Sequence, residues 1–303
     1  MKEFILDVAP GNHIGQMMTK FAALDMIAHY SRDNMRISFK KAAYITPATA
    51  VIILAIRDEL AKVGKRLYFS PYELRDNPAL VDFFLKSGLF NAIPKQSQLA
   101  VHNAHSYSIR RTNTSPFFIH TIDLDYLRQK GVAFASDNLV MEAMKAVDAL
   151  GIINDNPKAI LISKIMELLN NSFCHSRSSV AYLMVAQDKD DGYLLSVYDR
   201  GIGIPGSYDE YSAAHQLSAL SDEDAIKWSL QRGNSTLQDC GDFPRGVGLY
   251  TIFELMDNYH GWMSIASRNG AYTYKDGSAE TLHMPLSLTG TMLLLHIPST
   301  ITS

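Results

Sequence analysis

The stretch Glu167-Leu-Leu-Asn-Asn171-Ser-Phe-Cys-His175 decides how this 303-residue chain is interpreted. Glu167, Asn171 and His175 are spaced at i, i+4 and i+8, and this spacing keeps successive side chains on one face of an α-helix. Packing gives no reason for a carboxylate, an amide and an imidazole to share that face. Nucleotide-bound magnesium does, because it prefers oxygen ligands and takes only one or two from the protein. An amphipathic helix with a polar surface stripe is the alternative.

The start of this helix is also marked in the sequence. Pro157 fits the first turn, and Asp155 or Asn156 is the expected N-cap. Apolar residues on the other faces allow the helix to be buried.

A first glycine loop, Asp199-Arg-Gly201-Ile-Gly203, follows two predicted strands at 180–187 and 193–198. A carboxylate at a strand end can accept a hydrogen bond from an exocyclic amine, such as that of adenine. The Gly-x-Gly allows backbone to approach a flat ligand closely. A simple strand-ending turn is the alternative for this loop.

A second glycine loop, Arg245-Gly246-Val247-Gly248-Leu249, runs into a predicted helix at 250–257. The N–H groups at a helix N-terminus form an anion site, so phosphates fit here. No Gly-x-x-x-x-Gly-Lys-Ser/Thr motif occurs, and this excludes a P-loop.

In order and spacing, these segments resemble the nucleotide-binding boxes of the GHKL superfamily of gyrase, the heat-shock chaperone ATPase, histidine kinases and MutL. Residues 167–175 match its N box, and the two loops match its two glycine boxes. Gly290-Thr291 resembles the Gly-Thr that leads into the last strand. The resemblance covers about residues 136–300. It implies a Bergerat-type α/β sandwich with a mixed sheet and an ATP lid, with ATP and Mg²⁺ as cofactors.

The resemblance also implies roles for single residues. Asn171 would ligate magnesium, and Glu167 would orient or activate a water or hydroxyl nucleophile. Asp199 would bind the adenine amine, with Thr291 nearby on a bridging water. The other positions expected to bind the nucleotide are Gly201 and Gly203 at the base and Arg245, Gly246, Val247, Gly248 and Leu249 at the phosphates.

The segment 204–244 between the two glycine loops is long for a loop without structure, so we expect a mobile lid that carries a helix at 222–231. Within it, Ser235 and Thr236 can supply donors to phosphate, with Arg232 or Arg245 as the cation. Solvated lid surface is the alternative for these arginines.

The first half of the chain has a strand–helix–strand–helix pattern, which predicts a parallel or mixed sheet. The expected elements are strands at 35–39 and 65–70, a helix from Thr46-Pro47 to Lys62, a helix at 78–87 and a further strand at 117–123. Through Ile37-Ser-Phe39 and the helix start at Thr46-Pro-Ala-Thr49, it resembles the STAS domain of anti-anti-sigma factors. The expected fold class is therefore α/β (α+β), with a smaller STAS-like domain at 1–130 and the ATP-binding domain at 131–303.

The STAS resemblance raises the question of a phosphoacceptor. Thr46 or Thr49 lies where such domains carry a phosphorylated hydroxyl, but the acidic residue and the glycine of that motif are missing here. Helix capping is the alternative role for these threonines.

Whole-chain properties narrow the function classes. A net charge of −3 argues against a dedicated nucleic-acid surface. Cys174 and Cys240 lack metal-ligand spacing and suit a reducing compartment, with Cys174 as a packing residue. The longest apolar run, at 45–56, is too short to span a bilayer, and we expect a soluble cytoplasmic protein.

The expected function is ATP- and Mg²⁺-dependent transfer of the γ-phosphate to a Ser/Thr of a partner protein, as in anti-sigma kinases, or to water. One alternative is a non-catalytic nucleotide sensor whose ATP-ordered lid recruits a protein partner. A histidine kinase is another, although none of the ten histidines is followed by Asp or Glu. The phosphate acceptor, the partner and the oligomeric state, a homodimer included, are left open.

Overall fold

The computed structural model describes residues 2–5, 14–30, 33–39, 46–69, 117–152, 154–188, 192–236 and 248–299. Within these ranges the protein is a mixed α/β fold with a three-stranded and a five-stranded sheet. Three of the nucleotide-binding positions expected from the sequence, Arg245, Gly246 and Val247, lie outside the described residues, as does the helix expected at 78–87.

The N-terminal segment alternates strands and helices. Its elements are β1 (Lys2–Ile5), α1 (Ile14–Tyr30), β2 (Met35–Ser38), α2 (Pro47–Lys62) and β3 (Leu67–Phe69). The three strands are parallel in the order β1-β2-β3, which confirms the parallel pairing predicted for this half.

Helix α2 begins where its sequence predicts. The Thr46 side chain accepts a hydrogen bond from the Thr49 N–H at 3.1 Å, and Pro47 occupies the first turn. The Thr46 and Thr49 hydroxyls are 2.9 Å apart, and Thr49 is fully buried. These contacts are those of a helix cap.

The second sheet has five strands in the order β4-β5-β6-β8-β7. They are β4 (Phe117–Asp123), β5 (Val180–Gln187), β6 (Tyr193–Asp199), β7 (Trp262–Lys275) and β8 (Ser278–Ile297). Every pairing is antiparallel, so the prediction of a mixed sheet is wrong for the strands described. The reason is that β5–β6 and β7–β8 are each joined by a short turn, which only antiparallel strands allow. Strand β4 lies before residue 131, yet it pairs with β5.

The hairpin of β7 and β8 turns at Asp276-Gly277. Asp276 and Gly277 both have positive φ, 50° and 77°, at its tip. An Asp-Gly pair adopts these angles readily, and the turn they form matches the twist of the flanking strands.

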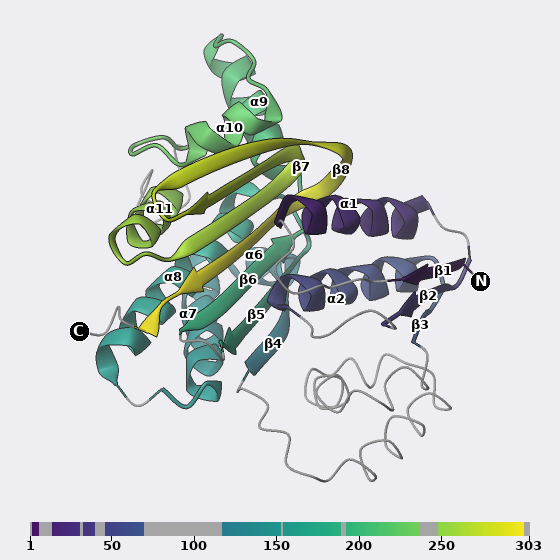
Figure 1. Cartoon of the computed structure of the whole chain (residues 1–303), viewed down its shortest axis with the longest axis horizontal. Coiled ribbons are helices and arrows are strands. Elements are labelled where there is room, and N and C mark those ends of the chain that lie inside the picture. Colours follow the sequence, from purple (N-terminus) through teal and green to yellow (C-terminus); the bar gives the residue numbers. More distant parts are fainter. Residues whose placement is uncertain are drawn as a thin grey trace.

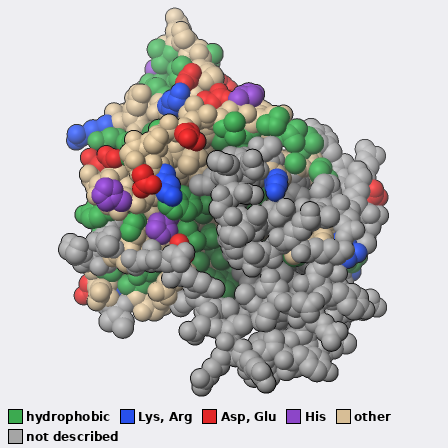
Figure 2. All heavy atoms as spheres, in the orientation of Figure 1, with side chains coloured by type: hydrophobic (Ala, Val, Ile, Leu, Met, Phe, Trp, Pro, Cys, Tyr) green, Lys and Arg blue, Asp and Glu red, His purple; other side chains and the backbone are tan. Residues whose placement is uncertain are grey.

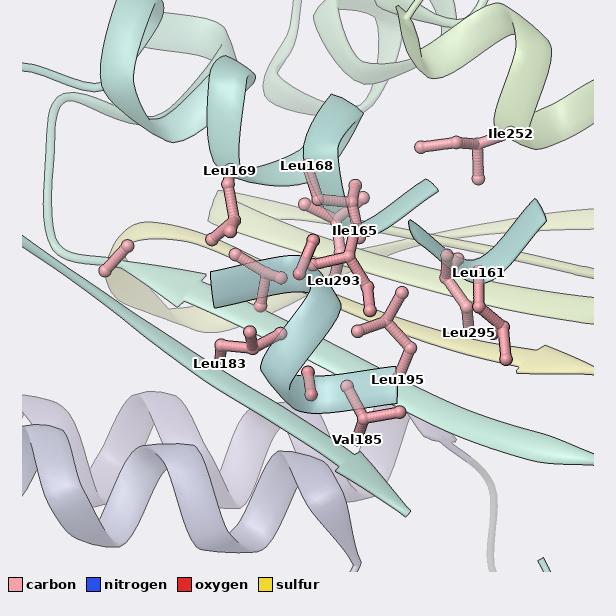
Figure 3. Packing of buried hydrophobic residues seen from close by; sticks show 14 of the residues in the cluster. Leu161, Ile165, Leu168, Leu169, Leu183, Val185, Leu195, Ile252, Leu293 and Leu295 are labelled. Atoms are coloured by element: carbon pink, nitrogen blue, oxygen red, sulfur yellow. The ribbon is translucent and has the colours of Figure 1, made fainter. Parts of the chain in front are cut away.

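One face of the five-stranded sheet is covered by α6 (Leu124–Lys130), α7 (Val132–Ala149), α8 (Asp155–His175) and α11 (Gly248–Asn258). We call this the inner face. Figure 3 shows Leu161, Ile165, Leu168 and Leu169 of α8 directed at leucine and valine side chains of the strands, with Ile252 of α11 nearby. Helix α8 begins one residue earlier than expected, because Asn154 rather than Asp155 or Asn156 is its N-cap.

The other face, which we call the outer face, is covered by α1 and α2 (Figure 1). Side chains of these two helices share one hydrophobic cluster with Tyr182, Tyr198, Met292 and Leu294 of the strands. The sheet is therefore the middle layer between two layers of helices, and the N-terminal segment contributes one of those layers.

Helices α9 (Gly203–His215) and α10 (Asp222–Ser229) lie at the end of the sheet near the β7–β8 hairpin (Figure 1). Acidic and basic side chains are interspersed over this end of the molecule (Figure 2). They include the exposed pairs Arg268–Asp209 at 2.5 Å and Lys227–Asp224 at 3.1 Å. Among the described helices, none has the length and apolar character needed to cross a membrane.

Candidate functional site

Glu167 on α8 faces the first turn of α11. The Thr251 hydroxyl lies 2.8 and 2.7 Å from its two carboxylate oxygens, and the Lys164 Nζ lies 3.1 Å from Oε2. Lys164 also donates to the Thr251 hydroxyl at 2.9 Å. Because a hydroxyl has one proton, Thr251 accepts from Lys164 and donates to one carboxylate oxygen at a time. The three side chains form a closed polar cluster between α8 and α11.

Lys164 and Thr251 were not expected as site residues. Lys164 is buried although it is a lysine, and this is rare without a partner. Its position three residues before Glu167, on the same helix face, is the one signal that the sequence offers. Thr251 lies three residues after Gly248, and nothing local in the sequence points to its contact with α8.

Asn171 lies one turn after Glu167 and faces the N-terminus of α11. A Cβ atom added to Gly248 would lie 3.4 Å from both Oδ1 and Nδ2 of Asn171. The Nδ2 atom is buried and has no hydrogen-bond partner among the described residues. An unpartnered buried donor costs about 1–3 kcal/mol, so its presence calls for an explanation. Leu249, beside Gly248, is half-buried and packs on the inner core.

Asp199 ends β6 and is 4% exposed. Burial raises its pKa to about 7, although the Gly201 N–H at 3.0 Å and the Ser172 hydroxyl at 3.4 Å donate to its carboxylate. Ser172 follows Asn171 directly on α8. Helix α8 therefore carries Glu167 and also contacts the carboxylate of the first glycine loop through Ser172.

Thr291 on β8 is the register partner of Asp199 and is also buried. Its hydroxyl lies 3.0 Å from that of Ser267, which accepts the Ile204 N–H at 3.0 Å. Ser267 thus links β7, β8 and the start of α9. This serine was not expected from the sequence, in which it is an ordinary strand residue.

The glycines of the first loop have a reason within the protein itself. A Cβ on Gly201 would lie 1.7 Å from the Ser176 carbonyl oxygen, and one on Gly203, where φ is +74°, would lie 2.6 Å from the Ser267 hydroxyl. The family resemblance implies that these glycines make room for a nucleotide base. Close packing of the loop against the end of α8 and against β7 requires them in any case.

The lid segment contacts the end of α8. The His175 Nδ1 lies 2.9 Å from the Thr236 hydroxyl, which is 2.6 Å from that of Ser207 on α9. Burial lowers the pKa of His175, so its imidazole is neutral at pH 7. Ser235 precedes Thr236 and is half-buried, whereas Arg232 is exposed. The helix predicted at 222–231 is present as α10, but α9 was not expected.

Cys174 packs against the inner core, as the sequence suggested. Its sulfur is disulfide-bonded, so it is not the reduced thiol that was expected. The other cysteine of the chain, Cys240, lies outside the described residues.

No protein-family model and no curated protein matches this chain. In the described part of the chain, no group of three or more His, Cys, Asp and Glu side chains is arranged to hold a metal ion.

Proposed function

We propose that the protein is an ATP- and Mg²⁺-dependent regulatory protein of the GHKL type, with a Bergerat-type ATP-binding domain and an N-terminal STAS-like domain. It binds ATP between α8, the start of α11 and the ends of β6 and β8. It transfers the γ-phosphate to a Ser/Thr of a partner protein or to water.

The observation that carries this proposal is the buried Nδ2 of Asn171 beside the N-terminus of α11, which has no hydrogen-bond partner among the described residues. Native proteins rarely leave such a group unsatisfied, and a ligand is one of the few explanations. The helix N-terminus beside it attracts anions, as a triphosphate requires. An amide oxygen is also a ligand that magnesium accepts, and magnesium on a nucleotide takes its other ligands from phosphates and water.

The remaining residues fit the same ligand. Asp199 is a buried acceptor at the end of β6, suited to the exocyclic amine of adenine, and Thr291 of β8 lies beside it. Glu167 lies one helical turn from Asn171 and is the candidate to orient or deprotonate the nucleophile. When bound, magnesium would neutralise charge on the phosphates, and Asn171 is the residue that would hold it.

A second function, that of a nucleotide sensor with negligible turnover, is favoured by one contact set. Both carboxylate oxygens of Glu167 lie within hydrogen-bond distance of Thr251, and one of them also accepts from Lys164. A carboxylate held in this way is a poor base until α11 shifts. In such a sensor, ATP would order the lid and expose a surface for a partner protein.

Nucleotide titration tests the binding site. Asn171→Ala and Asp199→Ala should each weaken ATP affinity at least about tenfold, while Asn138→Ala should not, because the Asn138 side chain donates to the Phe134 carbonyl of its own helix α7. Isothermal titration calorimetry in the presence of Mg²⁺ measures this directly. Wild-type affinity in both site variants would refute the site.

Phosphate release distinguishes the two functions. A catalytic protein should lose ATP turnover in Glu167→Ala and retain it in Asp148→Ala, which changes an exposed acidic residue of α7. Equal, near-zero turnover in wild type and Glu167→Ala, with ATP affinity intact, would favour the sensor.

A further inference from the structure

Three donor groups, from the five-stranded sheet and the loop that follows β6, lie within hydrogen-bond distance of the buried carboxylate of Asp25 on α1. Asp25 is 1% exposed and forms an ion pair with the guanidinium of Arg200. The Tyr198 hydroxyl lies 3.4 Å from Oδ1 and 2.9 Å from the Thr289 carbonyl oxygen, so its single proton serves one of these two acceptors at a time. The Thr289 N–H donates to Oδ2 at 3.1 Å. These donors come from the adjacent strands β6 and β8 and from the loop that follows β6.

These donors flank the residues of the candidate nucleotide site. Tyr198 and Arg200 are the immediate neighbours of Asp199, and Thr289 lies two residues before Thr291. Successive side chains of a strand point to opposite faces, so Tyr198 packs toward α1 and α2 while Asp199 meets Ser172 of α8. Asp25 therefore holds, from the outer face, the end of β6 and the adjacent part of β8, which carry Asp199 and Thr291.

A second N-terminal helix contributes to the same contact. Glu59 of α2 lies 3.5 Å from the Arg200 guanidinium, whose side chain is 7% exposed. A buried guanidinium requires such partners, because an unpaired charge in the interior is strongly unfavourable. The position of Arg200, and with it the backbone of the first glycine loop, thus depends on the docking of both α1 and α2.

We propose that Asp25 is a positioning residue for the base end of the nucleotide site, and that docking of α1 and α2 on the sheet thereby sets the affinity of that site. This inference rests on the proposed binding of ATP. A carboxylate that accepts a hydrogen bond from a specific amine must keep its position to within a fraction of an ångström. Residues packed on the far side of the sheet supply that restraint. By linkage, nucleotide binding in turn stabilises the docked N-terminal layer.

The test is the variant Asp25→Asn in the full chain, with calorimetric titration of ATP and of ITP. ITP has an oxygen in place of the 6-amine, so it gains nothing from a correctly placed Asp199. We expect the ATP dissociation constant to rise about tenfold, within the usual range of coupling between sites, and that of ITP to change far less. The preference for ATP over ITP should fall accordingly.

Asp58→Asn is the matched control. Asp58 lies on α2 and accepts from Tyr182 of the same outer face at 3.1 Å, and its ion pair is with Arg57 of its own helix rather than with the first glycine loop. It should leave the ATP-to-ITP ratio unchanged. A purely structural role of Asp25 would reduce the fraction of competent protein and weaken both nucleotides equally. An unchanged ratio in Asp25→Asn would therefore overturn the inference.

Tyr198→Phe covers the case in which Asp25→Asn does not fold. It removes one donor from the Asp25 carboxylate without leaving a buried charge, and we expect a smaller loss of the same preference. A preference equal to that of the wild type would again overturn the inference. If wild type binds neither nucleotide, the proposed function fails and the inference with it; if wild type prefers ATP and both variants do too, only the inference fails.

Discussion

The two faces of the five-stranded sheet carry polar clusters of opposite character. On the outer face, Asp25 and Arg200 are buried, oppositely charged and bonded to each other. On the inner face, Asp199 is buried and forms no ion pair with the described residues, and the Asn171 Nδ2 has no partner among them. The outer cluster is complete in the protein as it stands, whereas the inner cluster has capacity for further hydrogen bonds.

Burial acts differently on the acids of the two faces. On the outer face, Arg200 compensates the carboxylates of Asp25 and Glu59. On the inner face, desolvation raises the pKa of Asp199 to about 7, and hydrogen bonds from Gly201, Ser172 and the Thr291 backbone do not offset it. The paired charges of the outer cluster stabilise the fold. On the inner face, burial disfavours the ionised form of Asp199, and a ligand that donates hydrogen bonds would offset that cost.

The largest effect should come from breaking the outer cluster. Arg200→Ala leaves the buried carboxylate of Asp25 without its cation, and we expect the free energy of unfolding to fall by about 3–5 kcal/mol. Urea denaturation followed by circular dichroism measures the change. Arg177→Ala is the control, because the exposed Arg177–Glu210 pair at 2.6 Å should contribute no more than about 1 kcal/mol. Equal losses in the two variants would show that burial does not distinguish these pairs.

The next largest expected effect is the pH dependence that Asp199, on the inner face, gives to the free energy of unfolding. Because the pKa of Asp199 is about 7 in the folded protein and near 4 when unfolded, the folded state retains a proton that the unfolded state loses. The contribution of Asp199 to the free energy of unfolding therefore falls as pH rises from about 4 to 7, by at most about 1.4 kcal/mol per pH unit. Asp199→Asn should raise the free energy of unfolding on the order of 2 kcal/mol at pH 8 and hardly change it at pH 4.

Denaturation of both proteins across this pH range checks the sign. Asp125→Asn is the control, since Asp125 lies exposed on α6 and its replacement should change stability by less than about 0.5 kcal/mol at any pH. A stability difference for Asp199→Asn that does not vary with pH would contradict the assigned protonation.

The contrast between the faces also separates what local sequence can predict from what it cannot. The spacing in α8 and the alternation in the strands before Asp199 are local patterns, and each predicted its element. The outer cluster has no such pattern, because Asp25 and Arg200 are 175 positions apart and meet only through the packing of α1 on the sheet.

The error in sheet type has a similar origin. Strand positions are local properties, but pairing direction depends on which strands become neighbours, and β8 lies between β6 and β7. The glycines illustrate the same limit. Their presence in the first loop was clear from the sequence, but the Ser176 carbonyl that excludes a side chain at Gly201 belongs to another element. Both the pairing direction of the strands and the need for glycine at position 201 depend on which elements become neighbours in the fold.

A smaller effect is expected within the Lys164–Glu167–Thr251 cluster. Thr251→Val keeps the shape of the side chain and removes the hydroxyl that joins α11 to Glu167, so the free energy of unfolding should fall by about 1 kcal/mol. Thr251→Ser retains the hydroxyl and should preserve most of that contribution. Thermal denaturation of the two variants gives the comparison. A valine variant as stable as the serine variant would mean that the hydroxyl contributes nothing to the contact.

The smallest change in stability should come from Gly248→Ala, because Gly248 lies beside the Asn171 amide. Gly248 has ordinary φ and opens α11, where alanine is a better helix former by up to about 1 kcal/mol, so the fold should be unharmed or slightly stabilised. The added methyl group would lie 3.4 Å from the amide of Asn171 and occupy space beside its unpartnered Nδ2. Calorimetric titration should therefore show ATP affinity reduced about tenfold, a loss of about 1.4 kcal/mol, in a protein of unchanged melting temperature. Undiminished affinity would mean that the space beside Asn171 is not used by the nucleotide, and the difference drawn between the two faces would then concern packing alone.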